Sequence, residues 1–353
     1  MAKKIKVTVI RPTKPLLLGD FGKVLFITKE ADKPYKKYTK LDDVKTDFGA
    51  NSKMYKGVET FLSQEDSDGN VIQPDVWYCT SKATPNEEFL DSLPTGDFYG
   101  VIVDFYDEEF TKALAKWLTR NVKFAVVANS TAENNKLKES VRIYFMAGKA
   151  EGGNLDIFGL PAYTFAQGIN GRWSDRRILG VDPSAKTLTE ESDNEEGNIN
   201  YTRNFVGYNA VTSGSWCADG VRHADQTIKI DAIVHNIETN LARMLIIETN
   251  LARMLIEEKN TTMDGEGIPK VEALLNRVML AMGKQGAVAK NNSGEYLFKV
   301  TVPNIEDTSA QTGLTVDDYI NRTLRNTKVD FTISTEIEKI EVTLVWHDEP
   351  LTA

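Results

Sequence analysis

Two short apolar runs, separated by one amphipathic stretch, restrict the fold of this chain more than any other feature. The runs are residues 100–105 (GVIVDF) and 123–128 (KFAVVA), and between them residues 108–120 place Phe110 and Trp117 at helical spacing. Two parallel buried strands need a crossover connection, which is normally a right-handed helical one. The pattern therefore predicts a parallel pair of central strands and an α/β fold.

The flanking sequence continues this alternation of strands and helices. A Gly-Ala-Asn-Ser break interrupts a helical stretch at 41–63, and Asn51 or Ser52 is a suitable N-cap for its second half. Residues 141–182 mix apolar runs with Gly and Pro, which indicates short strands, whereas the acidic residues 190–199 indicate an exposed loop. The other predictions for this half are strands at 4–10, 23–28 and 76–80 and a helix at 87–93.

The C-terminal half is expected to be α+β. A long helix is predicted from residue 215 onward, because Ile230, Ile237 and Leu241 follow a period of 3.6 residues. The elements predicted after it are an apolar helix at 268–283, a polar helix at 315–325, and strands at 296–302, 328–334 and 337–346.

These elements divide the chain into five parts with mixed sheets flanked by helices and with extended strand arms at both ends. Arms are predicted at both ends because turn-rich segments join the two terminal strands to the body. The parts are an N-terminal arm (1–19), an α/β domain (20–140), a strand- and loop-rich segment (141–205), a C-terminal α+β core domain (206–335) and a C-terminal arm strand (336–353).

A tandem duplication lies inside the predicted long helix. Residues 237–246 (IETNLARMLI) recur unchanged as residues 247–256. Ten residues of α-helix turn through about 1000°, so the second copy is rotated by about 80° from the first. If both copies are present, which an intact mass measurement tests, we predict either a helix longer by about 15 Å or a copy looped out of it.

The charge of the chain is acidic overall and uneven. Net charge is −9, yet residues 1–40 hold eleven Lys and Arg against three Asp and Glu, and residues 336–353 hold five acids against one base. The acidic total argues against direct nucleic-acid binding. No run approaches the roughly 20 apolar residues that span a bilayer, and the start lacks the features of a signal peptide. We expect cytoplasmic folding, no secretion by a signal peptide and no membrane insertion.

A search for reactive motifs finds no catalytic, cofactor-binding or metal-binding constellation. The histidines form no HExxH motif, Cys79 and Cys217 form no CxxC pair, and Ser213-Gly-Ser215 is not a GxSxG nucleophile elbow. His223 and His235 are expected on different faces of one helix. We therefore expect a protein that is not an enzyme and that uses no cofactor and no metal.

The two ends of the chain each carry a well-patterned strand. A strand must find a partner for its backbone N–H and C=O groups. The two ends either pair within their own monomer or are donated to the sheet of a neighbour, and their opposite charges favour pairing of unlike ends. The apolar residues that share one face are Ile5, Val7 and Val9 in the first strand and Ile340, Val342 and Leu344 in the last.

Four groups of residues, spread over nearly the whole chain, carry a family resemblance. They are Leu41-Asp42-Asp43-Val44 with Asp47-Phe48-Gly49, Tyr55 and Phe61-Leu62; Phe98-Tyr99-Gly100-Val101 with Trp117 and Phe124; Thr212-Ser213-Gly214-Ser215-Trp216 with Asp219-Gly220-Val221-Arg222 and Asp225; and Ile268-Pro269, Gly286, Tyr296 and Val300-Thr301-Val302-Pro303. Together they resemble the tail sheath proteins of contractile phages and related particles. The departures are the duplication and Cys217-Ala218 after Trp216.

The resemblance implies a structural subunit that stacks as hexameric rings around an inner tube. On triggering, the subunit bodies would rotate outward while exchanged terminal arms keep the mesh intact, and the tube would be driven through a cell envelope. The implied partners are other copies of the chain, the inner tail tube protein, and baseplate and tail terminator proteins. The implied location is a virion tail sheath assembled in the cytoplasm of a bacterial host. The subunit-linking residues would be Ile5, Val7, Val9, Ile340, Val342 and Leu344.

Finer assignments from the same resemblance concern hinges and the tube. Ala2 to Lys14 and the stretch before Glu336 would act as hinges, and the helices at 268–283 and 315–325 are candidates for contact with the tube. Two other hypotheses stay open, namely another tail component such as a tube or baseplate protein, and a soluble α/β enzyme.

Overall fold

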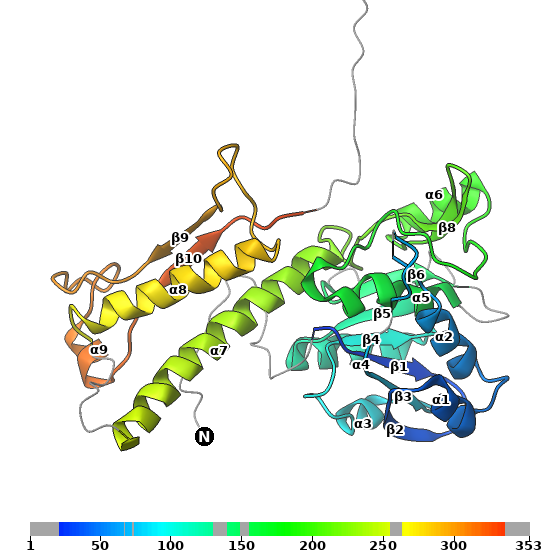
Figure 1. Cartoon of the computed structure of the whole chain (residues 1–353), viewed down its shortest axis with the longest axis horizontal. Helices are drawn as coiled ribbons and strands as arrows, with labels where there is room; N and C mark the ends of the chain where they lie inside the picture. The colour runs from blue at the N-terminus through cyan, green and yellow to red at the C-terminus, as the bar shows by residue number, and fades with distance from the viewer. Residues whose placement is uncertain are drawn as a thin grey trace, which may run out of the picture.

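A computed structural model describes residues 21–66, 68–72, 74–129, 140–148, 155–254 and 263–335. Its N-terminal part is an α/β domain built on a six-stranded sheet with the strand order β2-β3-β1-β4-β5-β6 (Figure 1). Neighbouring strands are parallel, except that the edge strand β2 runs antiparallel to β3. The strands are β1 (Val24–Thr28), β2 (Lys33–Tyr38), β3 (Trp77–Ser81), β4 (Gly100–Val103), β5 (Phe124–Asn129) and β6 (Ile143–Ala147).

The predicted pair of central parallel strands is confirmed. β4 and β5 are adjacent and parallel, with Gly100 opposite Phe124, and α4 (Glu108–Asn121) connects them. Every residue of both strands is buried. Burial on both faces explains why these strands read as continuous apolar runs instead of alternating ones. The fold is therefore α/β, with a mixed sheet flanked by helices.

Helices cover both faces of the sheet. Along β1, Val24 and Phe26 belong to the core on one face of the sheet, whereas Leu25 and Ile27 belong to the core on the opposite face. This alternation follows from the period of two residues in a strand. The first face carries α1 (Leu41–Phe48), α2 (Lys53–Leu62) and α5 (Leu155–Tyr163), and the second carries α3 (Glu87–Asp91) and α4. Ser52 caps α2 by accepting a hydrogen bond from the Tyr55 N–H, as predicted.

The interpretation of residues 141–182 as short strands was wrong for most of that range. Among the described residues of this range, 141–148 and 155–182, only Ile143–Ala147 is a strand, and α5 and the 3-10 helix η2 (Phe165–Asn170) follow it. Residues Asp156–Tyr163 of α5 are buried on all sides, so the sequence has no polar face and no helical period to detect. The boundary expected at residue 140 also falls between β5 and β6 of one sheet.

The acidic segment 190–199, expected to be an exposed loop, is mostly helical instead. It forms α6 (Leu188–Glu196), which begins with a capping box. Thr187 accepts a hydrogen bond from the Glu190 N–H, and the Glu190 carboxylate accepts one from the Thr187 N–H. The Thr-x-x-Glu spacing is the sequence signal for this start, and it outweighed the polar composition.

The C-terminal part is α+β, and its long helix is confirmed with a later start than predicted. It is α7 (Ala224–Met254), which begins after His223 and runs through the first decapeptide into the second. The duplication thus lengthens the helix instead of looping out. The predicted polar helix at 315–325 is shorter, because Arg322 adopts a positive φ of 51° soon after its end. The remaining elements are β7 (Thr202–Phe205), β8 (Tyr208–Thr212), α8 (Gly267–Lys284), β9 (Phe298–Thr301), α9 (Val316–Ile320) and β10 (Lys328–Phe331).

One prediction concerns the contact between α2 and α5. Gly57 of α2 lies directly against the ring of Phe158 on α5, and a Cβ atom placed there would overlap that ring. Gly57→Ala should therefore destabilise the chain by about 1–3 kcal/mol in denaturant unfolding, although alanine favours helix. Lys56→Ala, at the exposed neighbouring position, is the control and should leave the unfolding midpoint nearly unchanged.

Candidate subunit-linking site

The two-stranded sheet β9–β10 forms one outer layer of the C-terminal part and packs on α8 (Figure 1). The strands are antiparallel, with Val300 opposite Val329 and Lys299 opposite Asp330. The side chains alternate, so that one face contacts the core of α7 and α8 and the other is exposed. The half-buried residues are Phe298, Val300, Val329 and Phe331, and the exposed residues are Lys299, Thr301, Lys328 and Asp330.

Both long edges of this sheet present backbone groups outward. The Thr332 N–H donates to the Leu297 carbonyl at 2.9 Å, which identifies the hydrogen-bonded pairs of the antiparallel ladder. It follows that Val300 on β9 and Val329 on β10 direct their N–H and C=O groups away from each other. Within the part of the chain that the structure describes, residues 287–290 form β-bridges just outside the two strands, at Ile333 and Tyr296, and no third strand pairs along β9 or β10 themselves. A sheet of two strands is marginal in water, so a further strand on either edge would stabilise it.

The chain that leaves β10 is fixed to the body. The Ser334 N–H donates to the Ala287 carbonyl at 3.1 Å, and the Lys229 ammonium of α7 donates to the Ser334 carbonyl at 2.6 Å. Lys229 is almost fully buried and also pairs with Asp225 at 3.1 Å. The stretch before Glu336 was expected to be a hinge. Through Ser334, however, it is tied to α7.

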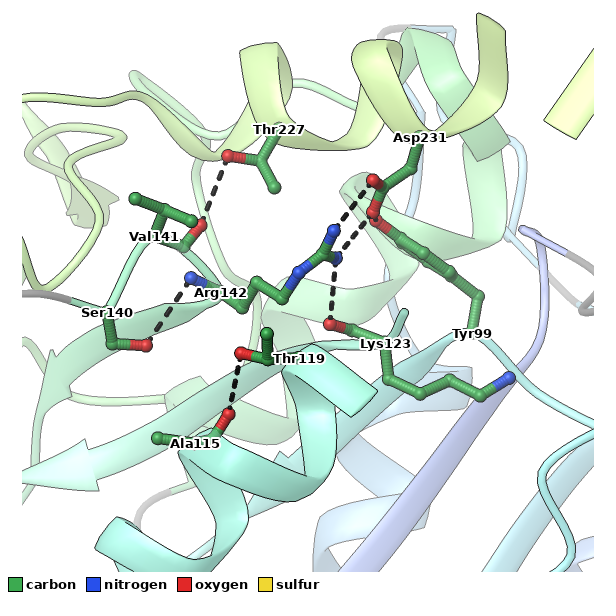
Figure 2. Close-up of polar contacts among 9 residues, drawn as sticks. All are labelled: Tyr99, Ala115, Thr119, Lys123, Ser140, Val141, Arg142, Thr227 and Asp231. Atoms are coloured by element: carbon green, nitrogen blue, oxygen red, sulfur yellow. Dashed lines mark hydrogen bonds and ion pairs between the residues drawn. The ribbon is translucent and has the colours of Figure 1, made fainter. Parts of the chain in front are cut away.

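A buried ion pair fastens α7 to the α/β domain (Figure 2). The Arg142 guanidinium, next to β6, donates two hydrogen bonds to the Asp231 carboxylate of α7, at 2.6 and 2.8 Å. The Tyr99 hydroxyl donates to the same carboxylate at 2.8 Å, and Arg142 also donates to the Lys123 carbonyl. Arg142 and Asp231 are 1% and 2% exposed. A buried pair of this kind holds its geometry because every alternative leaves a charge unpaired in the interior.

The guanidinium stays charged despite its burial. Desolvation lowers the pKa of Arg142, but the adjacent Asp231 carboxylate outweighs it and raises the pKa above its ordinary value. Sequence reasoning missed this pair. Ile230, placed in the predicted apolar stripe of α7, is less buried than its neighbours Lys229 and Asp231. The only signal in the sequence was that Lys229 and Asp231 lie between apolar residues of one predicted helix.

The strand order also creates the place where open α/β sheets usually bind ligands. The five parallel strands have the connectivity 2-1-3-4-5, whose switch point lies between the carboxyl ends of β1 and β4. Glu30, just after β1, occupies this place. Its carboxylate accepts hydrogen bonds from the N–H groups of Lys53 and Met54 at the start of α2, at 3.0 and 3.3 Å. The chain thus fills with its own carboxylate the position that a phosphate takes at a helix start.

Asp104, at the end of β4, lies at the same switch point. Burial raises the pKa of Asp104 to about 7, and nearby Glu30 adds to this effect whereas Lys53 opposes it. Among the described residues, no three His, Cys, Asp or Glu side chains converge to hold a metal ion. No helix in the same ranges is long and apolar enough to cross a membrane.

The histidines that the sequence placed on one helix lie on different elements. His223 precedes α7, and its Nδ1 atom is 2.6 Å from the Ser215 hydroxyl, while its ring lies against Trp216 with the ring centroids 4.0 Å apart. His235 lies within α7, with its ring centroid 6.0 Å from that of Phe21. The six predicted subunit-linking residues, Ile5, Val7, Val9, Ile340, Val342 and Leu344, lie outside the described residues.

Comparison with known proteins finds no family model and no curated protein that match this sequence.

The ion pair leads to a prediction about stability. Asp231→Asn leaves the Arg142 charge buried without its partner, so it should lower the free energy of unfolding by about 3–5 kcal/mol in guanidinium denaturation. The double variant Arg142→Met/Asp231→Leu removes both charges and should recover much of that loss. A double variant as unstable as the single one would contradict a role for the unpaired charge.

Asp104 leads to a prediction about pH. Between about pH 4 and pH 7 the unfolded chain is ionised at this residue, whereas the folded chain keeps the proton. Folding takes up a proton in this window, so the stability contributed by Asp104 is present at low pH and is lost as pH rises through 7, by on the order of 3 kcal/mol. Asp104→Asn should flatten the dependence of the unfolding midpoint on pH in this window.

Asp156 provides the background for that measurement. Burial raises the pKa of Asp156 to about 6, so it contributes a slope of the same sign that the Asp104→Asn variant retains. Asp156→Asn should therefore flatten mainly the lower part of the window. Equal slopes in the wild-type chain and the Asp104→Asn variant would contradict the assignment.

Proposed function

We propose that this chain is the sheath subunit of a contractile tail, linked to its neighbours by terminal arm strands that add to the β9–β10 sheet. The observation that carries the proposal is a two-stranded sheet with outward-facing backbone groups on both edges, mounted on two packed helices. Strand addition to such an edge gives affinity through main-chain hydrogen bonds and specificity through alternate side chains.

The side-chain pattern of the arms suits this sheet. Ile340, Val342 and Leu344 repeat at every second residue, so a strand that contains them would extend the apolar face formed by Val300 and Val329. The same holds for Ile5, Val7 and Val9 in the first arm. Each added strand would cover apolar surface that two strands leave partly exposed.

The charge on the outer face of β9 suits the acidic arm. Lys299 is exposed and would favour a neighbouring strand that carries Glu341, whereas on β10 the Asp330 carboxylate already pairs with the Lys328 ammonium at 2.7 Å. Such a cross-strand pair contributes roughly 0.2–1 kcal/mol. It is too weak to drive assembly, but it is sufficient to favour the acidic arm at the β9 edge.

The same architecture suits a body that moves as a unit while its links persist. The Arg142–Asp231 pair and the packing of α7 on α8 tie the acceptor sheet to the α/β domain. Rotation of the bodies during contraction would then take place in the arm segments beyond the described residues. Inner tube, baseplate and terminator proteins would be the other partners, in a tail assembled in the cytoplasm of a bacterial host.

A proline at the acceptor edge tests the proposal. Val300→Pro removes an N–H that points away from β10, so it should leave the β9–β10 ladder intact and block strand addition at the β9 edge. Negative-stain microscopy of the wild-type chain should show long, striated, hollow cylinders, and the Val300→Pro variant, with one of its two acceptor edges blocked, should stay folded and form no cylinders. Val300→Thr, which keeps the N–H, is the matched control and should still polymerise.

Changes in the donor arms should have the same effect as the change in the acceptor. Deletion of residues 1–14, or Val342→Pro, should abolish cylinders and leave the thermal unfolding of the body unchanged. Cylinders that persist in these variants would rule out strand exchange. A wild-type chain that stays monomeric and turns over a substrate would favour an enzyme, and unstriated tubes would favour another tail component.

A further inference from the structure

The extended segment that contains β10 is longer than its pairing with β9. Past the end of β10, Ile333 forms an antiparallel bridge with Val288, and the Ser334 N–H donates to the Ala287 carbonyl at 3.1 Å. The inner side of residues 328–334 is therefore paired along its whole length, first with β9 and then with the chain that follows α8.

The outer side of this segment is an acceptor edge without interruption. In an antiparallel ladder the hydrogen-bonded residues alternate with residues whose backbone groups point outward. Thr332 and Ser334 donate inward, so Val329, Phe331 and Ile333 direct their N–H and C=O groups away from β9. No strand of the described ranges pairs with these groups. The β10 edge thus offers three outward residues in succession.

The β9 edge is shorter, because local hydrogen bonds limit it at both ends. At one end the Phe298 N–H donates to the Tyr296 carbonyl at 3.1 Å, and at the other the Asn304 N–H donates to the Thr312 carbonyl at 3.3 Å. The outward residues that remain between these two contacts are Val300 and Val302. The two edges of the sheet are therefore unequal acceptors.

The charges beside the two edges also differ for the basic N-terminal arm. At the β9 edge, Lys4 and Lys6 of an added arm would lie beside the exposed Lys299, and like charges on neighbouring strands are destabilising. At the β10 edge they would lie beside Lys328 and Asp330, which form an ion pair at 2.7 Å and have no net charge. The basic arm is therefore disfavoured at the β9 edge only.

We propose that residues 4–10 of one copy add as a strand to the β10 edge of another copy, along residues 328–334. The predicted strand has the length of that edge, and its apolar residues alternate as the half-buried residues of β10 do. This assignment rests on the proposed strand exchange and leaves the β9 edge to the acidic arm. Residues 11–20 span at most about 35 Å, so the acceptor edge lies within that distance of Phe21 in the donor copy.

Disulfide trapping between two different full-length chains tests the assignment. Both chains carry Val342→Pro, which blocks the acidic arm and leaves both acceptor edges intact. The donor carries cysteine at position 4, 6 or 8 in turn, so that every register is sampled, and the acceptor carries Thr332→Cys beside β10 or Thr301→Cys on β9. Both threonines are exposed, which makes them a matched pair, and the native Cys79 and Cys217 are buried.

The best donor should form a mixed dimer with Thr332→Cys at least about tenfold faster than with Thr301→Cys. Faster trapping on Thr301→Cys, or no trapping on either, would overturn the assignment. Strand exchange itself is read separately, from Glu341→Cys and Thr301→Cys in chains that keep Val342. Trapping of that pair with none from the basic arm would leave the proposed function standing and remove only this inference.

Prolines at the two edges supply a second measurement. Val329 lies opposite Val300, and each directs its N–H outward at its own edge. Val329→Pro should slow trapping on Thr332→Cys at least about tenfold, whereas Val300→Pro and the control Val329→Thr should leave the rate unchanged. The reverse pattern would contradict the assignment. Equal melting temperatures of the two proline variants would show that the difference does not come from a lost fold.

Discussion

The bidentate pair between Arg142 and Asp231 is the interaction on which the arrangement of the two parts depends. Arg142 lies beside the last strand of the sheet, and Asp231 lies in the first turns of a 31-residue helix, so one buried contact fixes where that helix points. The Tyr99 hydroxyl donates to the Asp231 carboxylate, and the Lys123 carbonyl accepts from Arg142. Besides this pair, α7 contacts the α/β domain through Ala224 and Ile228, whose apolar contacts are non-directional, and through a hydrogen bond from the Thr227 hydroxyl to the Val141 carbonyl at 3.1 Å.

In the α/β domain, side chains of the chain itself occupy the switch point of the strand order. The same strand order in many proteins leaves a crevice for a ligand, but here the Glu30 carboxylate lies on the start of α2 and Asp104 lies beneath it. Fold alone would not have shown this arrangement, because one fold hosts many different sites.

The sequence predicted the helices that bury one face and the short strands that are buried on both faces. The strands at 100–103 and 124–129, the helix between them and α8 were all predictable from period and length. Residues 155–163 were not, because a helix buried all round has no period, and Gly159 and Pro161 argue against it. For α6, the acidic composition wrongly indicated a loop, whereas the spacing of Thr187 and Glu190 indicated the start of a helix. Within the candidate site, the strands β9 and β10 were predictable, whereas their open edges and the tie from Lys229 depend on tertiary contacts that no local pattern encodes.

The bond between Lys229 and the Ser334 carbonyl has a mechanical consequence. A pull on the chain beyond residue 335 would act along β10 and would load the β9–β10 hydrogen bonds in parallel. At Ser334 a share of the tension would pass through Lys229 into α7, and from there through Asp231 and Arg142 into the sheet. Tension applied to the C-terminal arm would therefore be shared between the β9–β10 hydrogen bonds and the contact of Lys229 with Ser334.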